Sequence, residues 1–236
     1  MNQSQSNIVG SPDVGKLDNN GIYERVFEAI VDHKLLPGTH LKEDELCDVF
    51  EVGRTRMRAV LSKLAADHIV EQVANRGVFV ARPSIDDARE VFRARRLVEG
   101  HLIRRAAENP TPALRTALND HLHREQAARD ANNMSAVIKR CGKYHQVLAD
   151  QAESPIMARF LRELIARSSL IVAIYESAPP NHCELEEHKL LTELVYAGQA
   201  DDAVTLMESH LIGIENRLDL SVRGNIQGGL RASLLG

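Results

Sequence analysis

Three histidines are spaced so that they could share a metal ion. His145, His188 and His210 each fall on an apolar stripe of a different predicted helix, where residues three and four apart lie on one face. The residues sharing these stripes are Val137, Cys141, Tyr144 and Leu148, then Leu185, Leu191 and Val195, then Ala203, Leu206, Met207 and Ile214. A buried imidazole needs a partner for each ring nitrogen, and one divalent metal would satisfy three of them. For any single histidine, the alternative is a hydrogen-bonded core residue.

A basic helix near the N-terminus carries a second chemical pattern. Arg54, Thr55 and Arg58 lie opposite its apolar stripe of Met57, Val60, Leu61 and Leu64, where they could meet phosphates and base edges. The segment 54–82 holds six Lys and Arg against two Asp and Glu, although the whole chain has a net charge of -4. This concentration of positive charge favours contact with nucleic acid. The alternative is a solvated charged face.

The composition is that of a helical protein packed on aliphatic side chains, with 4% aromatic residues and no tryptophan. No apolar run approaches the roughly 20 residues needed to cross a bilayer, so we expect no membrane partner. The first residues do not resemble a secretory signal, and three distant cysteines do not suggest a disulfide framework. We therefore expect a cytoplasmic protein.

The first third of the chain predicts a small domain after a polar tail. Residues 1–20 read as a flexible tail, and residues 21–83 as a winged helix-turn-helix. The predicted elements are a helix over 22–33, a turn at Leu36-Pro37-Gly38, a short helix, a recognition helix from Arg54 to about 68, and strands near 70–73 and 78–81. The turn at Asn75-Arg76-Gly77 forms the wing.

The remainder predicts helix after helix. Helices are expected over 84–108, 111–129, 135–152, 154–177, 184–197 and 201–220, and Ser84 or Asp86 can cap the first. The fold class is therefore mainly α, with an all-α antiparallel bundle of about six helices over 84–222. The glycine-rich residues 223–236 read as a second flexible tail.

The N-terminal motifs resemble the GntR family of bacterial transcription regulators. The Pro-Gly turn, Arg54-Thr55, Arg58 and the Asn-Arg-Gly wing stand at the family's spacing, and the helices after residue 83 look like the FCD effector domain of the FadR subfamily. The resemblance implies an operator-binding homodimer whose Arg54, Thr55, Arg58, Arg76 and Gly77 contact DNA. Two residues depart from the family pattern. Gly53 replaces the usual capping serine, and Arg56, in place of a proline, is expected to add charge at the DNA face.

The resemblance also implies a metal site in the bundle. The FCD pattern has Asp or Asn four residues before a histidine, and then two histidines 22 residues apart, which His145, His188 and His210 match. The first ligand position holds Cys141, which an i, i+4 spacing places on the face of His145. A thiolate ligand would favour zinc, with nickel as the alternative metal. Otherwise Cys141 only lines the cavity of a three-histidine site, and Glu184 is a spare candidate ligand.

Arg95 is the candidate effector-binding residue. It lies on an apolar stripe with Val91, Val98 and Leu102, so it must find an anion. One reading is an ion pair with Glu99, four residues on. The other, which the FCD resemblance supports, is that Arg95 binds the carboxylate of a small organic acid that also reaches the metal.

These observations predict a ligand-responsive DNA-binding regulator, more often a repressor in this family, and not an enzyme. Two alternatives stay open: a metal-dependent enzyme, and a helical module whose winged helix docks on protein. An open metal position could activate water, but no general base beyond Glu184 accompanies it.

Overall fold

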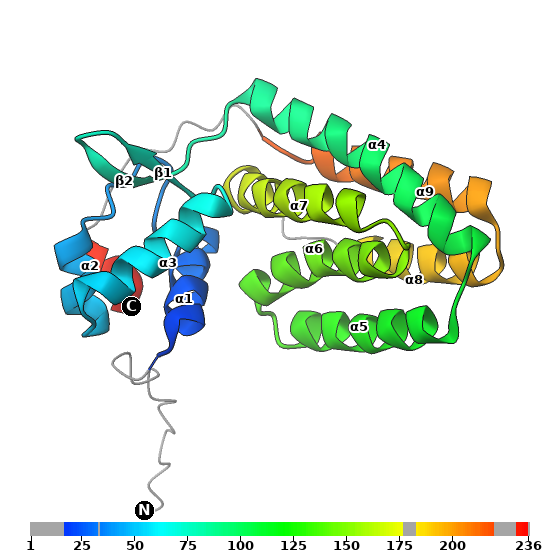
Figure 1. Ribbon diagram of the computed structural model, residues 1–236, viewed down its shortest axis with the longest axis horizontal. Coiled ribbons are helices and arrows are strands. Elements are labelled where there is room, and N and C mark those ends of the chain that lie inside the picture. The colour runs from blue at the N-terminus through cyan, green and yellow to red at the C-terminus, as the bar shows by residue number, and fades with distance from the viewer. Residues whose placement is uncertain (1–16, 33, 177–182, 220–229, 236) are drawn as a thin grey trace, which may run out of the picture.

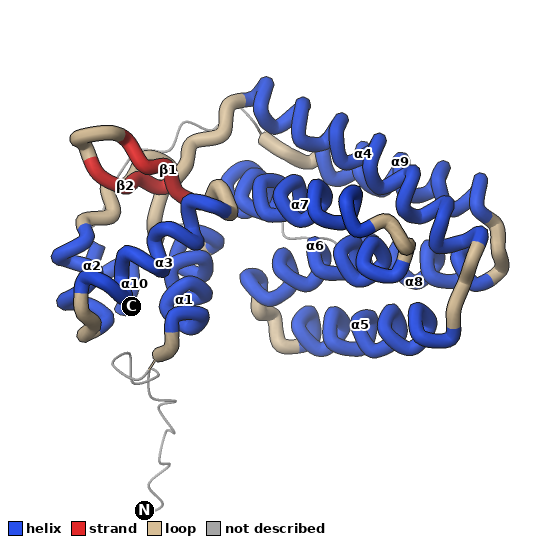
Figure 2. The backbone as a smooth tube through the Cα atoms, in the orientation of Figure 1, coloured by secondary structure: helices blue, strands red, loops and turns tan. Residues whose placement is uncertain are grey.

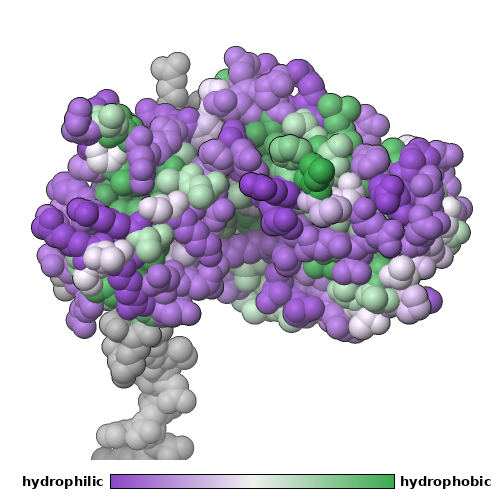
Figure 3. All heavy atoms as spheres, in the orientation of Figure 1, coloured by the Kyte–Doolittle hydropathy of each residue, from purple (hydrophilic) through white to green (hydrophobic). Residues whose placement is uncertain are grey.

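The computed structural model describes residues 17–32, 34–176, 183–219 and 230–235, and combines a winged helix-turn-helix with a helical bundle (Figure 1). Within these residues, the only strands are the two that form the wing (Figure 2). The face in Figure 3 is mainly hydrophilic, with apolar side chains in separate patches. A bilayer-spanning helix is not found among the described helices, because none combines enough length with enough apolar character.

The winged helix-turn-helix has the predicted order of elements. They are α1 (Asn19–Val31), α2 (Glu43–Phe50), α3 (Arg54–Ala66), β1 (Val70–Val73) and β2 (Gly77–Val80). The strands pair antiparallel, with Val70 opposite Val80. Gly53 is the N-cap of α3, as predicted, and makes no side-chain cap.

The first helix begins earlier than expected. Asp18 caps α1 by accepting a 2.7 Å hydrogen bond from the Gly21 amide, so residues 19 and 20 are helical. The prediction of a tail over 1–20 is therefore wrong at its end, because the polar Asp18-Asn19-Asn20 segment is a capping sequence. Residues 1–16 lie outside the described part of the chain.

The bundle contains the six predicted helices. They are α4 (Ile85–Glu108), α5 (Pro112–Asp130), α6 (Met134–Gln151), α7 (Pro155–Tyr175), α8 (Cys183–Tyr196) and α9 (Ala200–Asn216). Ser84 starts α4 with a capping box, in which its hydroxyl accepts from the Asp87 amide and Asp87 accepts from the Ser84 amide. The last helix ends four residues before the predicted 220, because the chain turns to bridge Leu218 to Glu176.

The predicted tail over 223–236 contains a further helix, α10 (Leu230–Leu235), so that prediction is wrong for these residues. Leu230 and Leu234 are buried in the core of the winged helix-turn-helix, against α1 and α2. Arg25 on α1 donates a 3.0 Å hydrogen bond to the Leu234 carbonyl. The described C-terminal residues are therefore tied to the DNA-binding domain.

Two hydrophobic cores hold the molecule together. One fills the winged helix-turn-helix and also includes Ile138 of α6 and Leu170 and Ile174 of α7. The other fills the bundle and includes Phe92 of α4 and Tyr144 of α6. Because α6 and α7 contribute to both cores, they connect the DNA-binding domain to the bundle.

Candidate metal centre and DNA-binding surface

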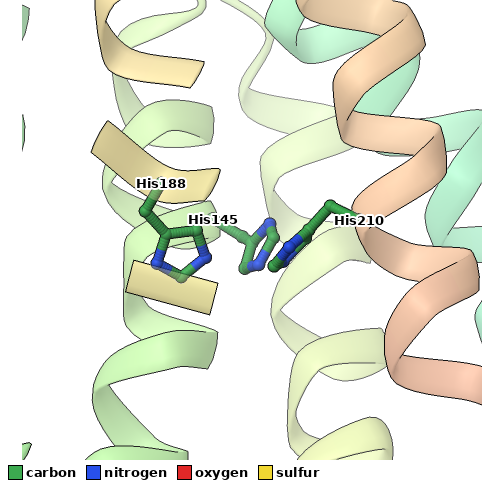
Figure 4. A group of neighbouring side chains, drawn as sticks. All are labelled: His145, His188 and His210. Atoms are coloured by element: carbon green, nitrogen blue, oxygen red, sulfur yellow. The ribbon is translucent and has the colours of Figure 1, made fainter. Parts of the chain in front are cut away.

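Three histidine side chains converge inside the bundle, from α6, α8 and α9 (Figure 4). His145, His188 and His210 each offer a ring nitrogen, and these atoms all lie within 4.8 Å of one another. All three side chains are buried, and their ring centroids are 4.9–5.3 Å apart. This is the donor set that a divalent transition metal takes from a protein.

A carboxylate holds the Nδ1 atom of each histidine. Glu125 Oε2 lies 2.9 Å from His188 Nδ1, Glu187 Oε2 lies 2.6 Å from His210 Nδ1, and Glu99 contacts His145 Nδ1. A carboxylate on Nδ1 fixes the ring orientation and leaves Nε2 for a metal. The Nε2 atom of His188 is buried and has no hydrogen-bond partner among the described residues. The structure therefore contains an orphaned imidazole nitrogen at the point of convergence.

Burial also keeps His145 in a form suited to metal binding. Burial lowers the pKa of His145 to about 3, although the negative charge of Glu99 acts to raise it. Burial raises the pKa of Glu99, but the charge of Arg95 and the hydrogen bonds with His145 and Arg95 outweigh it and lower this pKa to about 2. At neutral pH, the imidazole of His145 is therefore in the uncharged form that ligates metals, next to an ionised carboxylate.

His188 is further positioned by the ring of Tyr144. The two rings stack with centroids 4.0 Å apart, and the Tyr144 hydroxyl donates to the His188 carbonyl over 3.1 Å. His121 of α5 is also buried, but it is not part of the histidine group. Its Nε2 lies 2.9 Å from the Arg140 carbonyl.

Of the two readings considered for Arg95, the structure shows the ion pair with Glu99. Its Nε donates to Glu99 over 2.6 Å and its Nη1 to Ser168 Oγ over 3.1 Å, so the ion pair is present. Its Nη2 is buried and has no hydrogen-bond partner in the part of the chain that the structure describes, and the residue lines a cavity beside His145. The two N–H donors of Nη2 are thus left for an anion.

The cavity between Arg95 and His145 is small, about 30 Å³. It is enclosed partly by the close approach of α6 and α7 at Gly142, where a Cβ atom would lie 2.8 Å from Ile165 Cγ2. A cavity of this size holds about one water molecule. A larger ligand would require α6 and α7 to separate.

Cys141 lines this cavity but is not brought into the histidine group. Its thiol donates to Glu125 Oε1 and accepts from Arg129 Nη2, each over 3.4 Å. The side chain is directed toward α5, one helical turn before His145. This placement corresponds to the alternative of a three-histidine site with Cys141 at the cavity wall. The side chain of Glu184, the spare candidate, lies outside the described residues.

Sequence reasoning did not identify Glu125 and Glu187 as parts of the site. Glu125 had a signal, because it lies seven residues after Leu118 on the buried stripe of α5. A carboxylate on such a stripe needs a partner. No sequence signal marked Glu187, because its contact with His210 depends on the packing of α8 against α9.

The predicted DNA-contacting residues of α3 are exposed. Arg54 and Arg58 lie 65% and 66% exposed and pair with Asp44 and Glu43 of α2, each over 2.9 Å. Thr55 is exposed beside them, and a Cβ at Gly53 would meet nothing within 4 Å. The start of α3 is therefore open to a phosphate. Exposed ion pairs of this kind are weak, so phosphates could replace the two carboxylates.

Arg56 is directed toward α1 and not alongside Arg54 and Arg58. Its Nε donates to Asn19 Oδ1 over 2.7 Å, and its Nη2 contacts the Leu17 carbonyl. At 100° per residue, Arg56 lies about 160° from Arg58 around the helix, which turns it toward α1.

In the wing, Arg76 is exposed and its guanidinium lies 5.7 Å from the centre of the Phe79 ring. Gly77 has φ +107°, and a Cβ there would lie 2.5 Å from His40 Nε2. The geometry therefore requires glycine at this position because of the backbone conformation and the close approach of His40.

Comparisons with known proteins agree with this geometry. The model of the bacterial regulatory proteins of the gntR family matches residues 19–80, and the FCD domain model matches residues 90–213. The HTH-type transcriptional repressor RspR of Escherichia coli K12 is 24% identical over 194 residues, 82% of this chain and 85% of the relative. The galactonate operon transcriptional repressor of the same organism is 28% identical over 208 residues, 74% of this chain and 85% of that protein.

Solved structures share the fold. The crystal structure of a GntR transcriptional regulator from Rhodococcus sp. RHA1 has a TM-score of 0.70 at 23% identity, covering 84% of this chain and 95% of that one. Escherichia coli McbR/YncC has a TM-score of 0.69 at 19% identity, covering 87% and 98%.

The family and the named relatives are transcription regulators, which confirms the prediction of a regulator and not an enzyme. The chain belongs to the GntR family of bacterial regulatory proteins, with a GntR winged helix-turn-helix followed by an FCD domain.

Proposed function

We propose that this regulator is a homodimeric, metal-containing repressor of the cytoplasm, which a small carboxylate releases from its operator. The observation that carries the proposal is the arrangement of three buried histidines, each with a carboxylate on Nδ1 and all with ligand atoms within 4.8 Å. Hydrogen-bonded core histidines would not need to place these nitrogens at one point.

The metal would be held by His145, His188 and His210, and Cys141 would stay at the cavity wall. Three imidazoles suit zinc best, with nickel as the alternative. When bound, the metal supplies a Lewis acid that attracts the carboxylate of the effector. Glu99, Glu125 and Glu187 orient the ligands and balance the added positive charge.

The effector is a small organic acid. The partnerless Nη2 of Arg95 provides the hydrogen bond that would fix its carboxylate beside the metal. One relative is named for a galactonate operon, and galactonate is a sugar acid. Because the cavity is only about 30 Å³, binding would separate α6 from α7 at Gly142.

Operator binding would use Arg54, Thr55 and Arg58 of α3, with Arg76 and Gly77 in the wing. Two copies would place their recognition helices in successive major grooves. The effector would stabilise a bundle conformation that no longer matches this spacing, and so lower the affinity for DNA. Two relatives are named as repressors, which supports repression as the direction of control.

The test has two steps. An operator is first selected by the full-length protein from a random duplex library, and its affinity is then measured by fluorescence anisotropy with zinc or with EDTA. A panel of small carboxylates is titrated into the zinc-loaded complex. At least one should weaken operator binding, and Arg95→Lys should abolish that response.

The matched control is Arg96→Lys, since Arg96 is the neighbouring arginine and forms a half-buried ion pair with Glu215 instead of lining the cavity. This variant should respond as the wild type does. A carboxylate response that persists in both His188→Ala and Arg95→Lys would refute the proposed site. Release by no member of the panel would refute the proposed effector class.

A further inference from the structure

A second, larger cavity lies between the DNA-binding domain and the bundle. It has a volume of about 510 Å³ and is lined by α1, α6 and α7. Its lining residues include Tyr23, Phe27 and Ile69 on one side and Arg140, Lys143 and Ala166 on the other. Drug-sized ligands occupy pockets of about 300–1,000 Å³, often between domains. We call this space the interdomain cleft.

The charges in the interdomain cleft favour an anion. Lys139 pairs with Glu24 across the cleft, and Glu28 lies 3.8 Å from Arg25, so both carboxylates that line it have cationic neighbours. Arg140 and Lys143 line the same space and make no ion pair with any described residue. Two cations are therefore available to a ligand.

The opposite wall favours an apolar body. Phe27 is buried with its ring 4.9 Å from Lys139 Nζ, and Tyr23 lies beside it on α1. One face of the Phe27 ring is covered by Lys139, and one face of Tyr23 by Lys63 Nζ, 4.4 Å from its centre, so what these rings offer the cleft is apolar area. Cations on one side and apolar ring surface on the other match an apolar ligand that carries an acid group.

The interdomain cleft and the histidine site share a wall, which is α6. At 100° per residue, Arg140 and Lys143 face one side of this helix, whereas Cys141 and His145 face nearly the opposite side. A ligand in the cleft would contact α1 of the DNA-binding domain and α6 of the bundle at once. It would therefore stabilise one orientation of the DNA-binding domain relative to the bundle.

We infer that the interdomain cleft is a second ligand site, for an aromatic or otherwise apolar organic anion bound by Arg140 and Lys143. Its effect on operator binding rests on the proposed function, but occupancy of the cleft does not. The site is separate from the metal, so binding should persist in EDTA.

The probe for this site is 1-anilinonaphthalene-8-sulfonate, an aromatic sulfonate. It is titrated by fluorescence into the full-length protein in EDTA. We expect one saturable site per chain. Arg140→Ala combined with Lys143→Ala should weaken binding about tenfold, because each cation removed takes away a charge-assisted hydrogen bond. Ala166→Trp, which fills the cleft without changing charge, should abolish it.

The matched control combines Arg124→Ala with Lys189→Ala, which removes one arginine and one lysine from positions of α5 and α8 that do not line the cleft. It should bind as the wild type does. Phe160→Ala tests the exposed apolar surface of α7 as a competing site.

Equal probe affinity in the wild type, the Arg140/Lys143 variant and the Ala166 variant would overturn the inference. Loss of binding in Phe160→Ala alone would also overturn it. Because these titrations need neither metal nor DNA, their failure is distinguishable from failure of the carboxylate response.

Discussion

Replacing Glu187 by glutamine should weaken metal binding without disturbing the fold. Its Oε2 lies 2.6 Å from His210 Nδ1, and its side chain is 31% exposed. The hydrogen bond with His210 lowers the pKa of this carboxyl, so at neutral pH it contacts the ring as an anion. Glutamine keeps the shape but removes the charge that makes the imidazole a stronger ligand.

The size of this effect follows from the position of the carboxylate. Loss of a residue that orients a metal ligand reduces metal affinity about 10–100-fold. Because Glu187 is partly exposed and solvent screens its charge, the lower end is expected, about tenfold or about 1.4 kcal/mol. Glu125 and Glu99 are fully buried and also hold arginines, so their variants would test folding as well.

The assay is competition for zinc with a chromophoric chelator, and helix content is followed by circular dichroism. Glu186→Gln is the control, because this neighbouring glutamate instead pairs with the exposed Lys189 over 2.7 Å. Equal zinc dissociation constants for the two variants would refute the role given to the carboxylates.

Three further predictions concern DNA contact, the C-terminal helix and pH. Arg54→Ala and Arg58→Ala should each weaken operator binding and reduce the slope of log affinity against log salt concentration by about one. Arg56→Ala should leave this slope unchanged. Equal slopes in all three variants would count against the assigned surface. Leu234→Ala should lower the free energy of unfolding by about 2 kcal/mol in urea, because this side chain is buried in the DNA-binding domain; an unchanged midpoint would contradict that packing. In EDTA, the Tm should fall between pH 7.5 and 5, because the folded protein lowers the pKa of His145 to about 3 while the unfolded chain takes up its proton near pH 6.5. His145→Gln should make the Tm less dependent on pH. A wild-type Tm that rises toward acidic pH would contradict the prediction.

Much of the site could be predicted because helical periodicity is local. The three histidines lie on apolar stripes, so the spacing alone indicated that they face the bundle interior, where the structure brings them together. The carboxylate partners of these histidines could not be predicted from helical periodicity alone. Glu187 reaches His210 only through the way α8 packs on α9, which no pattern within one helix encodes.

The winged helix-turn-helix illustrates a similar limit. Its order of elements follows from the Pro-Gly turn, the basic helix and the wing turn, and the direction of Arg56 could have been worked out from its angle around α3. Helix α10 could not be predicted from the sequence, because only Leu230 and Leu234 mark an apolar face in a six-residue segment. A helix this short is unstable alone and forms through its contacts with α1 and α2.

X-ray absorption at the zinc edge of the stoichiometrically loaded protein would test the three-histidine centre most directly. We predict a first shell of nitrogen and oxygen at about 2.0–2.1 Å with the scattering signature of three imidazoles, and no sulfur shell. A sulfur shell at about 2.3 Å would place Cys141 on the metal, and a spectrum without imidazole would contradict the metal centre itself.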